Sequence, residues 1–120
     1  MIAVILAAAL ASAPAPALAD IGPEPAMEEF AALAEAALAR KLDRPEKKMI
    51  FEWPYRLVAG PAGYYTCGRV HGRRGQGRQE VWVSAVVAHG QAVDAQWSTK
   101  NGMLAWMCKK EVKKGNLVPR

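Results

Sequence analysis

The most regular hydrophobic pattern in the sequence repeats every three to four residues, which is the period of an α-helix. Glu28 and Glu29 lie in its first turn, and Arg40 and Lys41 lie in its last, so the charges complement the helix dipole at both ends. Pro25 stands where a helix can begin, because its missing N–H is not needed there. We predict an amphipathic helix whose alanine-rich stripe packs within the molecule or docks on another protein's helix. Its apolar positions are Met27, Phe30, Leu33, Ala34, Ala37, Leu38 and Leu42.

After a charged linker at residues 43–48, apolar and polar residues alternate with the period of β-strands. Pro54 interrupts the first alternating stretch, which is typical of an edge strand. Residues 81–87 are apolar on both faces, as expected for the centre of a sheet. The pattern predicts an antiparallel meander of three or four strands. They are residues 49–53 with a continuation at 55–59, then 64–71, 81–87 and 93–97.

The last element, residues 103–112, fits two patterns. As a helix it places Leu104, Met107, Cys108 and Val112 on one face, and as a strand it places Leu104, Trp106 and Cys108 on one face. Lysines at the end of the stretch favour the helix, because cations are stabilising at a helix C-terminus.

Residues 1–19 resemble a secretory signal peptide. An apolar run is ended by two prolines, and the small residues Ala17 and Ala19 precede Asp20, where we predict cleavage. The run is too short for a membrane span of roughly twenty apolar residues. No Lys or Arg precedes it, so retention as an anchor stays an alternative. The predicted location is periplasmic or secreted.

The chain has two cysteines, Cys67 and Cys108. In an exported protein two cysteines are expected to form a disulfide. The alternative, a reactive thiol, has little support, because there is no C-x-x-C motif. Cys67 and His71 on one strand would stand about 13 Å apart, too far for a hydrogen bond. The predicted fold is α+β, with an N-terminal amphipathic helix on a small antiparallel sheet and a C-terminal helix or strand tied to it by the disulfide.

Charge is unevenly distributed along the chain, whose net charge is +5. Residues 20–35 contain five acidic and no basic residues, whereas all sixteen Lys and Arg residues follow residue 36. A basic body is attracted to anionic partners such as lipid headgroups or polyanions, although excess lysine also serves solubility. We expect no specific nucleic-acid partner.

Residues 72–79 are rich in Gly and Arg and are predicted to form a solvated hairpin tip. They do not form a P-loop, because the sequence that follows is strand-like and not helical. Arginines can hold phosphate or carboxylate groups through paired hydrogen bonds. The candidate anion-binding or partner-binding residues are Arg69, Arg73, Arg74 and Arg78.

The remaining histidine, serine and carboxylate side chains do not form a recognisable catalytic or metal-binding pattern. His71 and His89 lack metal-ligand spacing, and Ser84 and Ser98 lack the glycines of a nucleophile elbow. The carboxylates after residue 36 are isolated from one another in the sequence. We therefore predict no catalytic residues, no metal and no cofactor, and expect a protein that is not an enzyme. The four tryptophans are interpreted as core residues and not as a stacking platform.

The run Cys67-Gly68-Arg69-Val70-His71 resembles a motif of small secreted proteins of proteobacteria, of the type Cys-Gly-x-Val-Asn. The resemblance extends over residues 64–108, with His71 where that pattern has Asn and with Arg78-Gln79 where a Gly and an aromatic are usual. It implies a periplasmic location and paired cysteines. The family has no assigned activity, so no catalytic residue is implied.

The predicted organisation is a signal peptide (1–19), an acidic arm with helix and linker (20–48), a sheet core with the C-terminal element (49–114) and a tail (115–120). The tail ends in Leu-Val-Pro-Arg, which matches a thrombin-site remnant and is left out of the functional hypotheses.

The leading hypothesis is a non-enzymatic periplasmic binding or accessory protein that docks on an envelope or membrane protein complex. Its helix, acidic arm or Arg-rich hairpin would provide the contact. The alternatives are a cationic binder of anionic polymer or lipid surfaces, and a small hydrolase or hydrolase inhibitor. The sequence indicates neither a ligand nor an oligomeric state.

Overall fold

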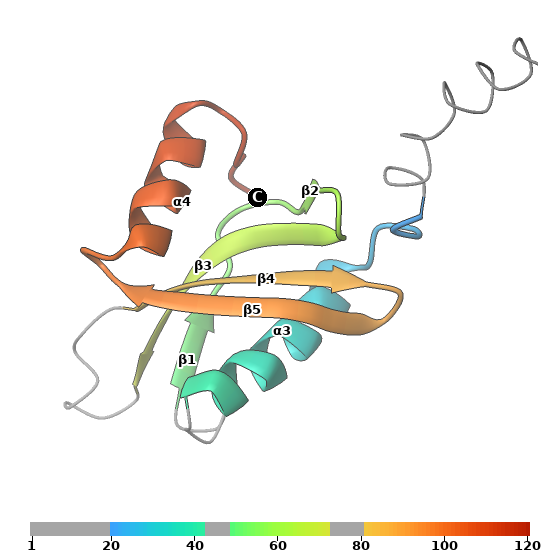
Figure 1. Cartoon of the computed structure of the whole chain (residues 1–120), viewed down its shortest axis with the longest axis horizontal. Coiled ribbons are helices and arrows are strands. Elements are labelled where there is room, and N and C mark those ends of the chain that lie inside the picture. Colours follow the sequence, from blue (N-terminus) through green and yellow to red (C-terminus); the bar gives the residue numbers. More distant parts are fainter. Residues whose placement is uncertain (1–19, 43–48, 73–80) are drawn as a thin grey trace, which may run out of the picture.

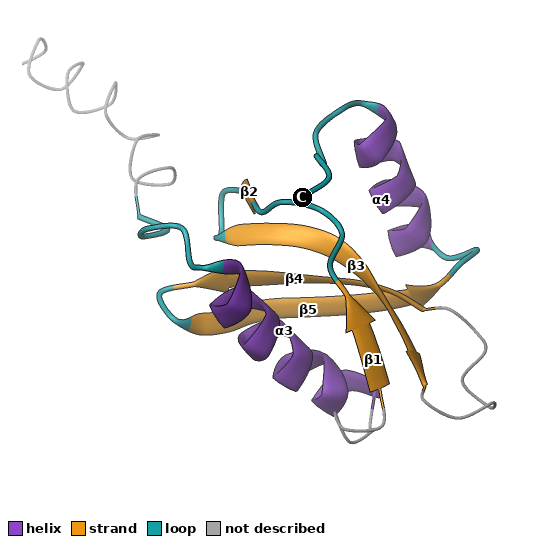
Figure 2. Ribbon diagram, turned by 180° about the vertical axis from the view of Figure 1, so that it is seen from behind, coloured by secondary structure: helices purple, strands orange, loops and turns teal. Residues whose placement is uncertain are grey.

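The computed structural model describes residues 20–42, 49–72 and 81–120. Within these ranges an antiparallel five-stranded sheet carries helix α3 on one face and helix α4 on the other (Figures 1 and 2). The α+β class and the C-terminal helix are confirmed. The sheet has five strands, where the sequence predicted three or four. The elements in chain order are α3 (Met27–Leu42), β1 (Met49–Glu52), β2 (Val58–Ala59), β3 (Tyr64–Gly72), β4 (Val81–Ala88), β5 (Gln91–Thr99) and α4 (Met103–Lys113).

The strand order is β1-β3-β4-β5, and β2 also pairs with β3. The first strand and its predicted continuation are therefore two short strands that share one partner. Pro54 lies between them and cannot donate to a ladder, which explains the interruption. Strand β4 is central, as its apolar pattern predicted, and the two-residue turn His89-Gly90 joins it to β5 with φ values of 52° and 73°.

The face of the sheet that contacts α3 is called the inner face. Phe30 of α3 meets the Trp53 ring edge-on at a centroid distance of 5.3 Å, and the Trp53 indole N–H donates to the Glu35 carboxylate at 2.8 Å. Ala34 and Ala37 let the helix backbone approach the strands closely. The stripe thus packs within the molecule. The buried inner-face cluster comprises Phe30, Ala34, Ala37, Leu38, Ala39, Met49, Trp53, Val70, Val83, Ala85, Val87 and Ala95.

The surroundings of Gly68 explain why a glycine follows Cys67 in the sequence motif. A Cβ atom at this position would collide with the Glu52 carbonyl oxygen and the Trp53 ring. Strand β3 can therefore pair with β1 and pass beneath the tryptophan only if this residue has no side chain.

The opposite, outer face carries α4. A disulfide joins Cys67 on β3 to Cys108 on α4, as predicted, with a Cα–Cα distance of 6.1 Å. Leu104 and Ala105 pack beside it against Trp82. Trp106 points away from this contact, so the helical pattern and not the strand pattern describes the element.

The tail packs onto the same face. Leu117 is buried in the cluster around the disulfide, and the Val118 carbonyl accepts a hydrogen bond from the Arg56 amide at 2.8 Å. The Arg120 amide donates to the Pro54 carbonyl at 3.0 Å. Whatever their origin, these residues are part of the folded unit. The predicted signal peptide, the linker 43–48 and the hairpin tip 73–80 lie outside the described residues.

Replacing both Cys67 and Cys108 by Ala removes the cross-link and keeps the two positions small and apolar. We expect the free energy of unfolding to fall by about 4 kcal/mol, because the open chain regains the entropy lost in closing a loop across 41 residues. Urea unfolding followed by tryptophan fluorescence measures the change. Wild-type protein unfolded with a reductant is the control and should show the same loss. A loss below about 1 kcal/mol would contradict the expectation.

Candidate docking site on the outer face

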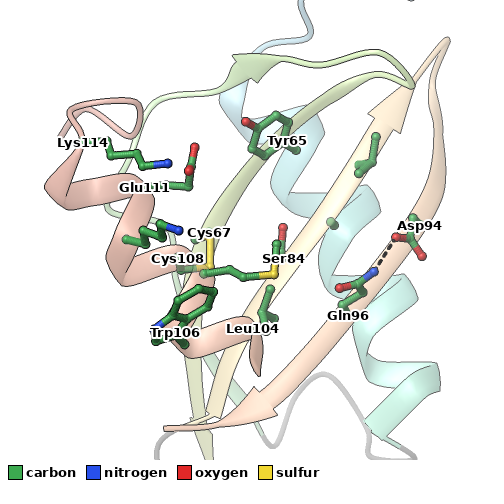
Figure 3. A pocket seen from close by; sticks show the side chains of 14 residues that line it. Tyr65, Cys67, Ser84, Asp94, Gln96, Leu104, Trp106, Cys108, Glu111 and Lys114 are labelled. Atoms are coloured by element: carbon green, nitrogen blue, oxygen red, sulfur yellow. Dashed lines mark hydrogen bonds between the residues drawn. A yellow bond between two sulfur atoms is a disulfide. The ribbon is translucent and has the colours of Figure 1, made fainter. Parts of the chain in front are cut away.

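Helix α4 covers only part of the outer face, and a groove of about 420 Å³ lies beside it (Figure 3). The floor comes from three strands, because alternation sends every second side chain to this face. The floor residues are Tyr65 of β3, Ser84 and Val86 of β4, and Asp94 and Gln96 of β5. The wall is one side of α4, formed by Leu104, Met107 and Glu111 with Lys110 and Lys114 above them.

The centre of the groove is apolar, and its polar groups are mostly engaged with one another. The Ser84 hydroxyl donates to the Thr66 carbonyl at 2.9 Å. The Gln96 amide donates to the Asp94 carboxylate at 3.1 Å, at the β5 side of the groove (Figure 3). The centre of the groove therefore favours burial of apolar groups, whereas its charged residues lie in the helix wall and on β5.

Tyr65 and Glu111 face each other at the other end of the groove (Figure 3). Burial, and secondarily the negative charge of Glu111, raise the pKa of Tyr65 above its ordinary value of 10.0. The phenol, like any tyrosine, keeps its proton at neutral pH and can act as a hydrogen-bond donor to a bound group.

Exposed apolar side chains are concentrated on β5 and α4, the two elements that border this groove. Of seven large hydrophobic residues that the described structure leaves exposed, five belong to β5 or α4. These five are Val93, Trp97, Met103, Trp106 and Met107. The other two, Ile50 and Val118, lie on β1 and on the tail.

The tryptophans divide equally between core and surface. Trp53 and Trp82 are each 6% exposed, as the core interpretation predicted. For Trp97 and Trp106 that interpretation is wrong, because their exposed fractions are 44% and 57%. The adjacent residues gave no signal of this exposure, because residues next to each other point to different sides of a strand or helix. Trp97 stands between Gln96 and Ser98, and Trp106 stands between Ala105 and Met107.

Arg69 is the one predicted binding arginine within the described residues. Its guanidinium lies 5.4 Å from the centre of the Trp82 ring, and the Lys109 amine lies 5.7 Å from the same ring. Its Nε atom, like Nε2 of His71, is buried without a hydrogen-bond partner in the described ranges. Arg69 thus packs against the disulfide cluster, away from the groove lining, and its binding role stays a prediction. Arg73, Arg74 and Arg78 lie outside the described residues.

The acidic arm is tied to the turn between β4 and β5. The His89 ring lies 3.5 Å from the Asp20 carboxylate and 3.1 Å from the Asp20 carbonyl. The Tyr64 hydroxyl donates to the Gly22 carbonyl at 2.8 Å. The start of the arm therefore lies at the far end of β5 from α4.

Two properties of the described residues bear on the kind of site. No three His, Cys, Asp or Glu side chains in these ranges lie close enough together to hold a metal ion. Neither described helix is long and apolar enough to cross a membrane.

No family model, curated protein or solved structure matches the chain. The resemblance to small secreted proteobacterial proteins therefore stays a prediction that depends on residues 67–71 and their surroundings.

Glu111→Gln removes the charge opposite Tyr65 and keeps the size of the side chain. We expect the Tyr65 pKa to fall toward its ordinary value of 10.0 without reaching it, because burial, the larger cause, is unchanged. An NMR titration of the tyrosine ring signals measures the shift. Wild-type stability should also fall as the pH rises above 10.0, because the unfolded chain loses this proton first.

Glu52→Gln on β1 is the matched control, because this carboxylate lies outside the groove lining. An identical Tyr65 titration in wild type and Glu111→Gln, or the same shift in Glu52→Gln, would show that Glu111 does not act on Tyr65.

Proposed function

We propose that this chain is a non-enzymatic binding or accessory protein of the periplasm that docks on an envelope or membrane protein complex. The observation that carries the proposal is the concentration of exposed apolar side chains on β5 and α4, next to an open apolar groove. Patches of this kind on a soluble fold are typical of protein interaction sites. We call this surface, made of β5, α4 and the groove between them, the docking surface.

The disulfide supports the location. Both cysteines of the chain form the disulfide, and both are buried, with exposed fractions of 4% for Cys67 and 2% for Cys108. Such bonds form and persist in oxidising compartments. Together with the signal-like residues 1–19, this favours a protein that works outside the cytosol.

The side chains in the groove support binding over catalysis. The Ser84 hydroxyl is engaged by a backbone carbonyl, and the Tyr65 phenol is held in its neutral form. A general base or nucleophile needs the opposite, namely a group activated by a neighbour and poised to give or take a proton.

Met107→Glu places a charge on the wall of the groove and tests the proposal. We expect wild-type protein to capture a defined partner from solubilised envelope membranes, and the variant to lose it by roughly thirtyfold or more, because a central apolar contact becomes a desolvated charge. Quantitative mass spectrometry of the captured proteins measures the loss.

Ile50→Glu is the matched control. Ile50 is 43% exposed against 49% for Met107, but it lies on β1 and outside the groove. The control should retain the partner. Equal capture by both variants, or equal loss, would contradict docking through this surface.

A second candidate function is supported by the lysines of α4. Lys109, Lys110, Lys113 and Lys114 are all exposed on or next to the helix that also exposes Met103 and Trp106. Lysines beside exposed apolar and aromatic groups are typical of segments that bind at an anionic lipid surface. The chain would then be a cationic binder of such surfaces.

Replacing Lys110, Lys113 and Lys114 by Gln tests this second candidate. Each lysine near an anionic membrane contributes about 1 kcal/mol, so vesicle binding should weaken on the order of a hundredfold. Sedimentation with anionic phospholipid vesicles at low and high salt measures the binding, with neutral vesicles as the control. Binding that is unchanged by added salt and by the lysine substitutions would contradict an electrostatic mechanism.

A further inference from the structure

The two edges of the sheet are built differently. One edge is made of β1 and β2, which are four and two residues long and are separated by Pro54. The other edge is β5, with nine residues, no proline and a single charged residue, Asp94. Within the described residues β5 pairs only with β4, so its outer backbone groups have no strand partner (Figure 1). Short strands, prolines and charges normally protect an edge from further pairing, and β5 has few of these features.

Strand β5 contains one irregularity, which limits where another strand could pair. The register with β4 shifts between Val86 and Val87, so that Val93 is an extra residue on β5. From Asp94 to Thr99 the register is continuous. Residues 94–99 thus form a regular strand segment that is open on its outer side.

Hollows lie on both faces of this open strand. On the outer face is the groove beside α4. On the inner face a second hollow of about 350 Å³ is lined by Ala37, Arg40 and Lys41 of α3 and by residues 92–95 of β5. Asp94 lines both hollows, so both reach the same edge. Side chains of a strand placed along β5 would alternate between the two faces, and those beside Asp94 and Ala95 would reach the inner hollow.

The two hollows differ in chemistry. Toward α4 the nearest groups are apolar, with Leu104 and Met107 in the wall of the groove. Toward α3 the hollow has the two cations Arg40 and Lys41 against the single carboxylate of Asp94. Trp97 lies on this inner side as well, because it pairs with the inner-face residue Val83, and it is 44% exposed.

We propose that the partner contributes an extended segment that adds to the outer edge of β5 along residues 94–99 as a further strand of the sheet. Its residues alternate, with apolar side chains toward α4 and acidic side chains toward Arg40 and Lys41. Backbone hydrogen bonds hold the segment and the two hollows select its side chains, as in other cases of strand addition. This inference rests on the proposed function and names the chemistry of its partner.

A second copy of the chain fits this edge less well. Two copies paired through β5 would place their α3 helices on the same face of one continuous sheet, with Arg40 and Lys41 of each near the other copy. Each copy of the chain carries a net charge of +5, so the like charges oppose the contact. An acidic, apolar strand from another protein has the complementary charge.

The test selects a display library of random peptides of about ten residues on the disulfide-bonded protein. We expect enriched peptides to alternate apolar and acidic residues. Hydrogen exchange with a selected synthetic peptide should slow, by about tenfold or more, the backbone amides of residues 94–99 that point away from β4, because these gain strand partners. The amides of β1 should be unaffected.

Two variants make the test specific. Gln96→Lys with Trp97→Lys adds protective charges to the β5 edge and should weaken peptide binding at least about tenfold. Ile50→Lys with Ala59→Lys adds the same charge at exposed positions of the opposite edge and should leave binding unchanged.

Three results would overturn the inference: no enriched peptide, peptides that bind as helices without protecting β5, or a concentration-dependent dimer that protects β5 by itself. The last result assigns the edge to a second copy. If capture from membranes depends on Met107 while β5 gains no protection, the proposed function stands and strand addition is wrong. If capture is also independent of Met107, the docking surface itself is wrong.

Discussion

The Cys67–Cys108 bond joins β3 covalently to α4, a short helix that otherwise packs on β4 and β5. Helix α4 has eleven residues and buries only Leu104, Ala105 and Cys108. A helix of this length is marginal in water without tertiary support. The covalent bond supplies that support, because it fixes one point of α4 directly above β3. The position of α4, and with it the extent of the uncovered outer face, therefore depends on this disulfide.

The two faces of the sheet consequently have different roles, since one carries the larger core and the other is partly open. Helix α3, with sixteen residues and small alanine contacts, packs closely on the inner face and forms the larger of the two cores. On the outer face, Leu117 and Trp82 complete a smaller core around the disulfide, and the rest of the face remains open. Stability thus comes mostly from one side of the sheet, which leaves the other side free to carry exposed apolar side chains.

Local patterns predicted most of the architecture. The three-to-four-residue spacing located α3, and the apolar run at 81–87 located the central strand. The disulfide was predicted because the sequence offers two cysteines and a predicted export signal. The helix and the strand depend on the pattern of neighbouring residues, and the disulfide depends on there being only two cysteines to pair. Both can be read directly from a sequence.

The docking surface could not be predicted in the same way. Trp97 and Trp106 are exposed whereas Trp53 and Trp82 are buried, and only the way in which the helices cover the two faces of the sheet decides which tryptophans are covered. Strand β5 lies at the edge of the sheet because of the order in which the strands assemble, which the pattern of residues within β5 does not reveal. Tyr65 meets Glu111 across the groove, although the two residues lie far apart in the sequence. Such contacts are properties of the assembled fold.

The most direct test is oxidative footprinting of tryptophan and methionine side chains in the native protein before and after selective reduction of the disulfide. With the bond intact, Trp106, Met103 and Met107 should be modified, whereas Trp82 and Trp53 should be protected. After reduction, Trp82 should become reactive as α4 leaves the sheet, while Trp53 stays protected under α3. If Trp82 remains as protected as Trp53, the disulfide does not hold α4 in place, and the docking surface described above does not depend on it.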